Sequence, residues 1–330
     1  MSTAVQFYLS TLLVYLGVDV MACWGLNLQY GYTGLLNFAF IIFQAAGAYT
    51  AAVLTLGSPS SNGGFQTYIG GATLPFPVPL LAAAAVGALL SLVVGFVSLR
   101  RLRSDYQAMV MLVISLIATA VVTTQVQLFN GPAGLALIPQ PLADSLNLTA
   151  LNYQWFYVGV TALICAITYF FVHRITSSPL GRSLRAIREN PQAAAALGRD
   201  VTSRSLMALV IGGAIAGLSG GVLVQFIGAW APGSWLYPET FVLFTALIVG
   251  GSGNNMGALL GALMVPVAFV EGARYVPEIG HAGVTEALQW IVTSLLMLLF
   301  LWFRPKGLIP ERRRKFKRRP APAPSVESSG

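Results

Sequence analysis

Nine apolar runs follow one another along this chain, and they constrain its fold more than any other feature. The runs lie at about 7–28, 33–56, 78–99, 106–128, 153–172, 204–229, 239–252, 255–276 and 286–303. Most are long enough for a helix to cross roughly 30 Å of hydrocarbon at about 1.5 Å per residue. A helix also satisfies its own backbone hydrogen bonds there. The sequence therefore predicts an all-α, polytopic membrane helix bundle with about nine (eight to ten) transmembrane helices.

The composition excludes the other broad classes of protein. The 330 residues are 56% hydrophobic and only 9% charged, whereas a soluble domain carries about 25% charged residues. A disordered chain would be poor in apolar residues and rich in charge. One run, 239–252, is shorter than the others and can be either a span or a re-entrant segment, which is tolerated where protein or a water-filled cavity surrounds it.

The positive charges are grouped at the ends of apolar runs. Lys and Arg are absent from residues 1–99, and then gather at 100–103, 174–204 and 304–319, with Arg274 as the exception. Such loops are cytoplasmic by the positive-inside rule, so nine crossings place the N-terminus outside and the C-terminus inside. The net charge of +8 therefore indicates topology and not nucleic-acid binding, which requires a basic face with groove-reading elements.

Two domains are expected from this pattern. Residues 1–303 form the transmembrane domain, which includes a cytoplasmic loop at about 174–203. Residues 304–330 form a basic, disordered cytoplasmic tail that lies near anionic lipid.

The loop at 174–203 contains a predicted amphipathic surface helix. Ser178 is a good N-cap and Pro179 a good first helical residue. Arg185 and Glu189 have the i,i+4 spacing of an ion pair. An apolar stripe faces one side and consists of Leu180, Leu184 and Ile187. Such a helix can lie in the membrane interface or dock into a groove on a cytoplasmic partner.

Four segments spread along the chain resemble motifs of the branched-chain amino acid permease family of ABC importers, of the LivM type. They are GYTGLLNF at 31–38 with 47–49, SPLGRSLRAIREN at 178–190 with 193–198, IVGGSG at 248–253 with Gly257 and Gly261, and FRPKGL at 303–308. The resemblance implies an inner-membrane, multi-pass permease subunit of an ATP-driven, binding-protein-dependent importer. It also implies that the helix at 178–190 presses into the ATPase. The coupling candidates are Gly181, Arg182, Arg185, Arg188 and Glu189.

The same resemblance implies the partners and the solute. The partners are ATP-binding subunits, a second homologous permease subunit and a secreted or periplasmic solute-binding protein. The solute is a branched-chain or other small aliphatic amino acid, with urea or short amides as the alternative. The sequence agrees that this chain is not the ATPase, because it contains no Gly-x-x-x-x-Gly-Lys-Ser/Thr phosphate loop. No cofactor and no metal site is expected.

Two glycine repeats predict close contact between helices. Their members have the spacing of small residues on one helical stripe and are Gly213, Gly217 and Gly221, then Gly253, Gly257 and Gly261. Small residues let helix backbones approach in lipid, where burial of apolar surface does not drive association. Packing within the subunit is the simplest role, and a pathway wall or a dimer seam is the alternative.

Polar residues inside the apolar runs are candidates for the translocation pathway. They are Asn27, Asn37, Gln44 and Tyr49, with Gln44 seven residues after Asn37 and expected on the same helical face. Hydrogen bonding between helices is the alternative role. Asp19 needs a partner or water inside the membrane. An ion-coupled secondary transporter would use such carboxylates, but only Asp19 and Glu271 qualify, and that class leaves the basic loop without a role.

Overall fold

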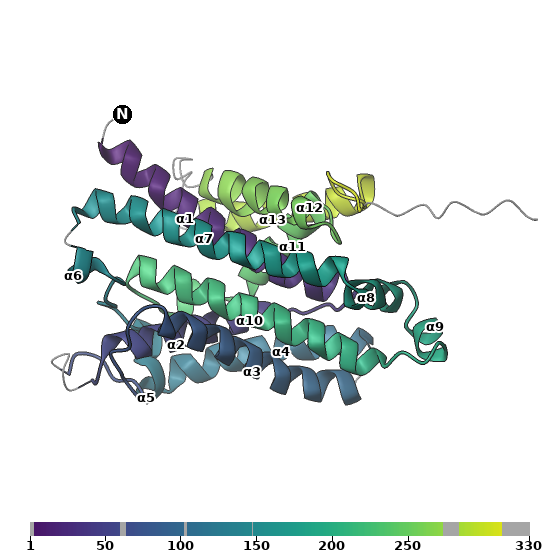
Figure 1. Ribbon diagram of the computed structural model, residues 1–330, viewed down its shortest axis with the longest axis horizontal. Helices are drawn as coiled ribbons and strands as arrows, with labels where there is room; N and C mark the ends of the chain where they lie inside the picture. The colour runs from purple at the N-terminus through teal and green to yellow at the C-terminus, as the bar shows by residue number, and fades with distance from the viewer. Residues whose placement is uncertain (1–2, 60–63, 102–103, 147, 273–283, 312–330) are drawn as a thin grey trace, which may run out of the picture.

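The computed structural model describes residues 3–59, 64–101, 104–146, 148–272 and 284–311. The helices run beside one another along the long axis of a single bundle, as Figure 1 shows. Helices α8 (Pro179–Glu189) and α9 (Pro191–Ala196) lie at one end, and the N-terminus lies at the other. The described residues contain no named strand and two isolated β-bridges. The predicted all-α class is confirmed.

Five helices are long and apolar enough to cross a membrane. They are α1 (Thr3–Leu26), which continues as the π-helix η1 (Asn27–Gly31), α3 (Val78–Arg101), α4 (Ser104–Thr124), α7 (Ala150–Ser177) and α10 (Val201–Ile227). The shorter ones are α2 (Phe40–Leu56), α11 (Tyr237–Gly250), α12 (Asn255–Ala262), which continues as η4 (Leu263–Glu271), and α13 (Val284–Phe303). The chain is thus a multi-pass membrane protein, and the count of about nine crossings stays a prediction.

Short elements join these helices. At the end of the bundle away from α8 they are α5 (Val126–Phe129), η2 (Gly131–Ala133), α6 (Ala143–Leu146) and η3 (Pro232–Ser234). Leu135 pairs with Trp230 in a β-bridge, which ties the segment after η2 to the segment after α10. The backbone N–H groups of Leu135 and Trp230 each donate to the other residue's carbonyl oxygen, and the Ile138 N–H donates to the Gly228 carbonyl oxygen.

Helix α10 lies between the α2–α3 pair and the α1–α7 pair. Its glycine stripe permits this position, because a methyl group at Gly217 would collide with the carbonyl oxygen of Ala83 in α3. Gly213 likewise lies against Ser91 of α3, and an ideal Cβ at Gly221 would lie 3.0 Å from the Cβ of Ala83. Close approach of small residues gives packing that lipid cannot supply. The stripe on α10 therefore packs within the subunit.

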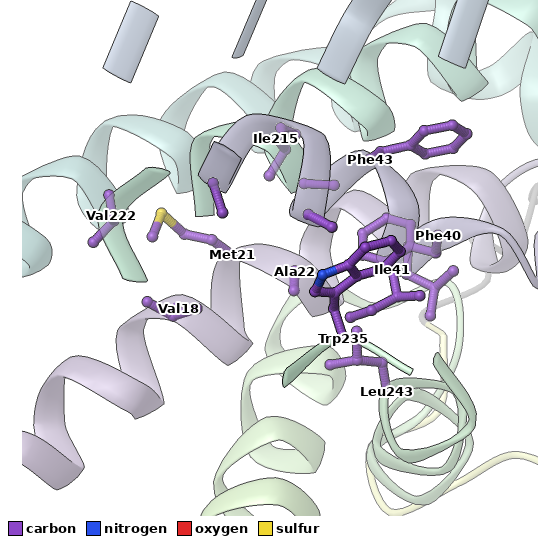
Figure 2. Packing of buried hydrophobic residues seen from close by; sticks show 14 of the residues in the cluster. Val18, Met21, Ala22, Phe40, Ile41, Phe43, Ile215, Val222, Trp235 and Leu243 are labelled. Carbon is purple, nitrogen blue, oxygen red and sulfur yellow. The ribbon is translucent and has the colours of Figure 1, made fainter. Parts of the chain in front are cut away.

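Large aromatic and aliphatic side chains fill the centre of the bundle. Figure 2 shows Trp235, from the segment before α11, among labelled residues that include Ala22 of α1, Ile41 of α2 and Leu243 of α11. Trp235 is 1% exposed, and its indole Nε1 donates to the Tyr49 hydroxyl oxygen at 3.3 Å. The core thus joins the start of α11 to α1 and α2.

Two sequence predictions about helical faces are wrong. Gly253 lies in the turn between α11 and α12, at φ +80°, so it does not share a helical stripe with Gly257 and Gly261. Those two glycines face Gly250 and Ala246 of α11. Asn37 precedes α2, which begins at Phe40, so Asn37 and Gln44 do not lie on one helical face. In both places the backbone turns where spacing alone suggested a continuous helix.

Some predictions concern residues outside the described part of the chain. The basic tail from 312 to 330 and Arg274 lie there, as does the side chain of Glu271.

Candidate functional site

Helix α8 begins and ends as its sequence indicates. The Ser178 hydroxyl oxygen accepts a hydrogen bond from the Leu180 N–H at 3.2 Å, and Pro179 is the first helical residue. At the other end, Asn190 leaves the helix with an extended backbone, and its Oδ1 accepts from the Ala193 N–H at 2.9 Å. Asn190 therefore ends α8 and caps α9. The predicted N-cap of α8 is confirmed.

One face of α8 is buried against the membrane helices. Its buried residues are Gly181, Ser183, Leu184 and Ile187. Gly181 lies against the end of α7, where any side chain would collide with the carbonyl oxygen of Thr176. Leu184 is 1% exposed and belongs to the main hydrophobic cluster. Close contact at Gly181 and burial of Leu184 fix α8 to the bundle, so a displacement of α8 would move its neighbours.

The opposite face of α8 is open to solvent. Arg182, Ala186 and Glu189 are exposed on it. Leu197, which follows α9, is 82% exposed. Single exposed apolar side chains are common on protein surfaces, so Leu197 marks an accessible position and is not by itself a docking site. The sequence analysis missed Leu197, because one leucine after an alanine run carries no helical periodicity.

The two remaining arginines of α8 point into the protein. Arg188 Nη2 lies 2.5 Å from Glu311 Oε2, and Arg188 Nη1 donates to the carbonyl oxygen of Gly31. Arg185 Nε lies 3.2 Å from Glu311 Oε1, and Arg185 Nη2 donates to the carbonyl oxygen of Thr176 at 2.9 Å. The predicted ion pair of Arg185 with Glu189 is therefore wrong. Glu311, far away in sequence, is the partner among the described residues.

An aromatic ring completes this cluster. The Arg185 guanidinium lies 5.2 Å from the centre of the Tyr32 ring, a cation–π geometry. Burial raises the pKa of Tyr32 above its ordinary value, so the hydroxyl stays neutral. The charge balance of the cluster therefore rests on Arg185, Arg188 and Glu311.

Asn27 and Asn37, two of the predicted pathway residues, are held in internal hydrogen bonds. Asn27 Oδ1 accepts from the Gly253 N–H at 2.8 Å, and its Nδ2 donates to Asn255 Oδ1 at 3.1 Å. Asn37 Nδ2 donates to Gln29 Oε1 at 2.8 Å, and its Oδ1 accepts from the Ala39 N–H at 3.0 Å. Both asparagines are fully buried. These contacts tie turns of the backbone together, as expected for buried polar groups.

A cavity of about 360 Å³ lies between α1, α2, the end of α10, the start of α11 and η4. Its volume far exceeds the ~15 Å³ that one water molecule requires. Its polar lining includes Asp19, Gln44, Ser234 and Glu239. Gln44 is thus the predicted pathway residue that lines this cavity. Tyr49 instead stacks on Phe129, with ring centres 4.3 Å apart.

Glu239 joins the cavity because α11 starts there. It lies in the first turn of α11, where the helix dipole stabilises a carboxylate. The sequence analysis missed it, because it stood at the edge of an apolar run. Asp19, near the middle of the continuous helix Thr3–Gly31, lines the same cavity. A charge at the centre of a bilayer costs about 2.5–3.5 kcal/mol on insertion scales, so such residues usually face the bundle interior or a water-filled cavity.

The two sites are suited to docking and passage. The described residues hold no group of three or more His, Cys, Asp or Glu side chains placed to bind a metal ion. The cluster at α8 links this partly exposed helix to η1, to the end of α7 and to the segment after α13. The cavity offers carboxylates and an amide inside the span.

Comparisons with known proteins agree on the family. A family model described as "Branched-chain amino acid transport system / permease component" matches residues 8–301. The chain is similar to the probable branched-chain amino acid transport permease protein LivM of Methanocaldococcus jannaschii, with 26% identity over 92% of this chain and 94% of the relative. It is 29% identical to the high-affinity branched-chain amino acid transport system permease protein LivM of Escherichia coli, over 89% of this chain and 68% of the relative.

A relative with a different solute also matches. The guanosine ABC transporter permease protein NupQ of Bacillus subtilis is 27% identical, over 70% of this chain and 71% of the relative. No solved structure matches the chain.

Proposed function

Because this chain belongs to the branched-chain amino acid transport permease family, and so is a permease subunit of an ABC importer, we propose that it carries branched-chain or other small aliphatic amino acids. The observation that supports a coupled importer best is α8. Its inner face is packed into the membrane helices, while Arg182 and Glu189 remain exposed on its outer face. A helix built in this way transmits a push from a cytoplasmic partner to the spans.

The proposed topology follows from that role. The end of the bundle with α8 and α9 is cytoplasmic, as the basic loop at 174–204 predicts. The segment after α13 lies at the same end (Figure 1), which supports a cytoplasmic C-terminus. The opposite end then faces outward, toward a solute-binding protein.

The proposed partners divide the work. ATP is hydrolysed on separate subunits, since the sequence contains no phosphate loop. A second homologous permease completes the transmembrane unit. Names of relatives support the solute, because both LivM proteins are described as branched-chain amino acid permeases. One relative is a guanosine permease. Membership of the family therefore does not by itself identify the solute, which has to be tested.

The coupling role is tested with the complete importer reconstituted in proteoliposomes. Arg182→Glu and Leu197→Asp change only exposed side chains on the proposed docking surface. We expect each variant to reduce leucine uptake at least tenfold. Each should also abolish the rise in ATPase rate that leucine-loaded binding protein causes, because the contact between the ATPase subunit and α8 is lost.

Arg204→Glu is the matched control. Arg204 is also exposed and lies at the same end of the bundle, but it belongs to α10 and not to the α8 surface. It should retain uptake and ATPase stimulation within about twofold. Normal coupling in both docking variants, or an equal loss in the control, would contradict the role of α8.

A further inference from the structure

We propose that two adjoining cavities near α8 form one phospholipid site, with an anionic headgroup in a polar cavity and an acyl chain in an apolar groove. The inference goes beyond the proposed function and requires only that the chain spans a membrane. Three features support it. The groove is as long as one leaflet, the polar cavity adjoins its end, and positive charge dominates around the polar cavity.

The apolar groove lies between α1, α7 and α12 with the start of η4, and its volume is about 600 Å³. Leu16, Val158 and Leu259 line it, one from each of the three α-helices, and none of its described lining residues is charged. Ala166 and Met256 are exposed in its lining. The groove therefore opens at the surface of the bundle, where a membrane protein meets lipid.

The length of the groove matches one leaflet of a bilayer. Its lining runs along α7 from Val158 to Tyr169 and along α1 from Leu13 to Trp24. Each stretch covers about 16 Å, and half of the hydrocarbon core is about 15 Å. At the end nearer α8, the Trp24 and Tyr169 rings lie 5.2 Å apart. Trp and Tyr are enriched at the membrane–water interface, so the groove has the length and the boundary of an acyl-chain site.

The polar cavity begins where the groove ends. Its volume is about 500 Å³, and Tyr169 and Met256 line both cavities. His173 and Ser177 of α7 and Arg185 of α8 also line it, and α8 lies just beyond the end of α7 (Figure 1). The Tyr169 and His173 rings stack with their centres 5.8 Å apart. An amphipathic ligand can therefore occupy both cavities at once, whereas a small ion fills only one.

Positive charge dominates around the polar cavity. Glu311 is the one carboxylate among its described lining residues. Arg185 and Arg188 share that carboxylate, so two guanidinium groups and one carboxylate leave a net charge of +1. In the sequence, seven of the eight residues after Glu311 are Lys or Arg. Basic pockets and polybasic segments at the membrane surface attract anionic lipids, so an anionic headgroup matches this cavity.

His173 supplies a hydrogen-bond donor for the headgroup phosphate. Its side chain is exposed in the polar cavity, and no hydrogen-bond partner among the described residues occupies its imidazole nitrogens. An imidazole carries at least one N–H donor whether it is neutral or charged. His173 lies one turn before the end of α7, at the level where a headgroup meets its acyl chains. The cavity thus offers a hydrogen bond in addition to positive charge.

Photocrosslinking in the purified, delipidated complete importer tests the site. The probe is phosphatidylglycerol with a diazirine midway along one acyl chain. We expect its crosslinks in this chain to concentrate at 13–24, 158–169 and 256–263. Unlabelled phosphatidylglycerol should compete at least fivefold more effectively than phosphatidylcholine with the same acyl chains, because only the first carries a net negative charge.

Two matched pairs of variants test the groove and the polar cavity separately. Ala166→Trp fills the groove, whereas Ile167→Trp adds the same side chain one residue away, at a position that lines neither cavity. Ser177→Glu adds a negative charge to the polar cavity, and Ser203→Glu adds it to α10 at the same end of the bundle. All four positions are exposed. Ala166→Trp and Ser177→Glu should reduce crosslinking at least fivefold, and the two controls should stay within about twofold.

Several outcomes would overturn the phospholipid site. Equal competition by the two lipids, unchanged crosslinking in Ala166→Trp, or an equal loss in Ile167→Trp would each do so. If inorganic phosphate displaces the probe as well as phosphatidylglycerol does, the polar cavity takes a free anion instead.

The second permease subunit is the other candidate for covering the groove. A photoreactive maleimide attached to Ala166→Cys, in a background without Cys23 and Cys165, would then crosslink to that subunit, and the lipid assignment would fail. Copurification with the ATPase subunits checks that each variant assembles. All of these results leave the importer role intact, because Arg182→Glu and Leu197→Asp test that role separately.

Discussion

Gly217 marks the closest approach of α10 to its neighbours. A methyl group there would collide with the Ala83 carbonyl of α3, and a methyl group at Gly47 of α2 would collide with the backbone of Gly217 itself. Gly159 provides the contrast, because an ideal Cβ there has no atom within 4 Å. Two glycines in long helices of the same bundle thus differ completely in what surrounds them.

We expect Gly217→Ala to lower the stability of the purified complex by about 1–3 kcal/mol, the usual cost of overpacking. Gly159→Ala should change it by less than about 1 kcal/mol, since alanine favours a helix and meets no neighbour. Thermal unfolding in detergent compares the two variants. If Gly159→Ala lowers the unfolding temperature as much as Gly217→Ala does, close helix approach is not the cause of the destabilisation.

At the scale of elements, α8 has two kinds of arginine on one short helix. Arg182 is exposed, whereas Arg188 is held between Glu311 and the Gly31 carbonyl. The helix is therefore joined by a hydrogen bond to the end of η1 and by an ion pair to the segment after α13.

A double-mutant cycle on Arg188→Gln and Glu311→Gln measures that link. Because the two side chains touch, we expect a coupling free energy of about 0.5–3 kcal/mol in unfolding of the purified complex. The matched cycle of Arg182→Gln with Glu311→Gln should give a value near zero. Additive effects of Arg188 and Glu311 would mean that the pair does not hold α8 in place.

At the scale of the whole molecule, two exposed leucines mark opposite ends of the bundle. Leu197 is 82% exposed beside α9, and Leu137 is 81% exposed in the segment that is bridged to the end of α10. If α8 is cytoplasmic, these positions lie on different sides of the membrane. Their nearly equal exposure makes them a matched pair for a test of topology.

Single cysteines test this orientation in a background without Cys23 and Cys165. In cells with a permeabilised outer envelope, a membrane-impermeant maleimide should label Leu137→Cys and leave Leu197→Cys unlabelled. Lysis followed by dissociation of the ATPase subunits should make both reactive. Labelling of Leu197→Cys in intact inner membranes would reverse the proposed topology.

Much of this arrangement is readable in the sequence for a physical reason. Apolar runs predict membrane helices because hydrocarbon admits few other backbones. Ser178 and Pro179 predict the start of α8 because capping is local. The stripe at Gly213, Gly217 and Gly221 predicts a helix contact because its spacing lies within one helix.

Other features required the fold. The partner of Arg185 and Arg188 is Glu311, more than a hundred residues away, and no periodicity relates them. Gly253 leaves its expected helix because the chain turns between α11 and α12, where its N–H meets Asn27. Glu239 lines the same cavity as Asp19 and Gln44 only because the fold places the start of α11 beside α1 and α2.

The sequence by itself thus determined the class of this protein, a multi-pass membrane protein with an amphipathic helix in a basic loop, because hydropathy, charge and capping act through neighbours in the chain. Only the tertiary structure decided which face of α8 is free and which polar residues share a cavity. Both features depend on contacts between segments that are distant in the sequence, because helix packing determines which partner lies beside each buried charge or amide.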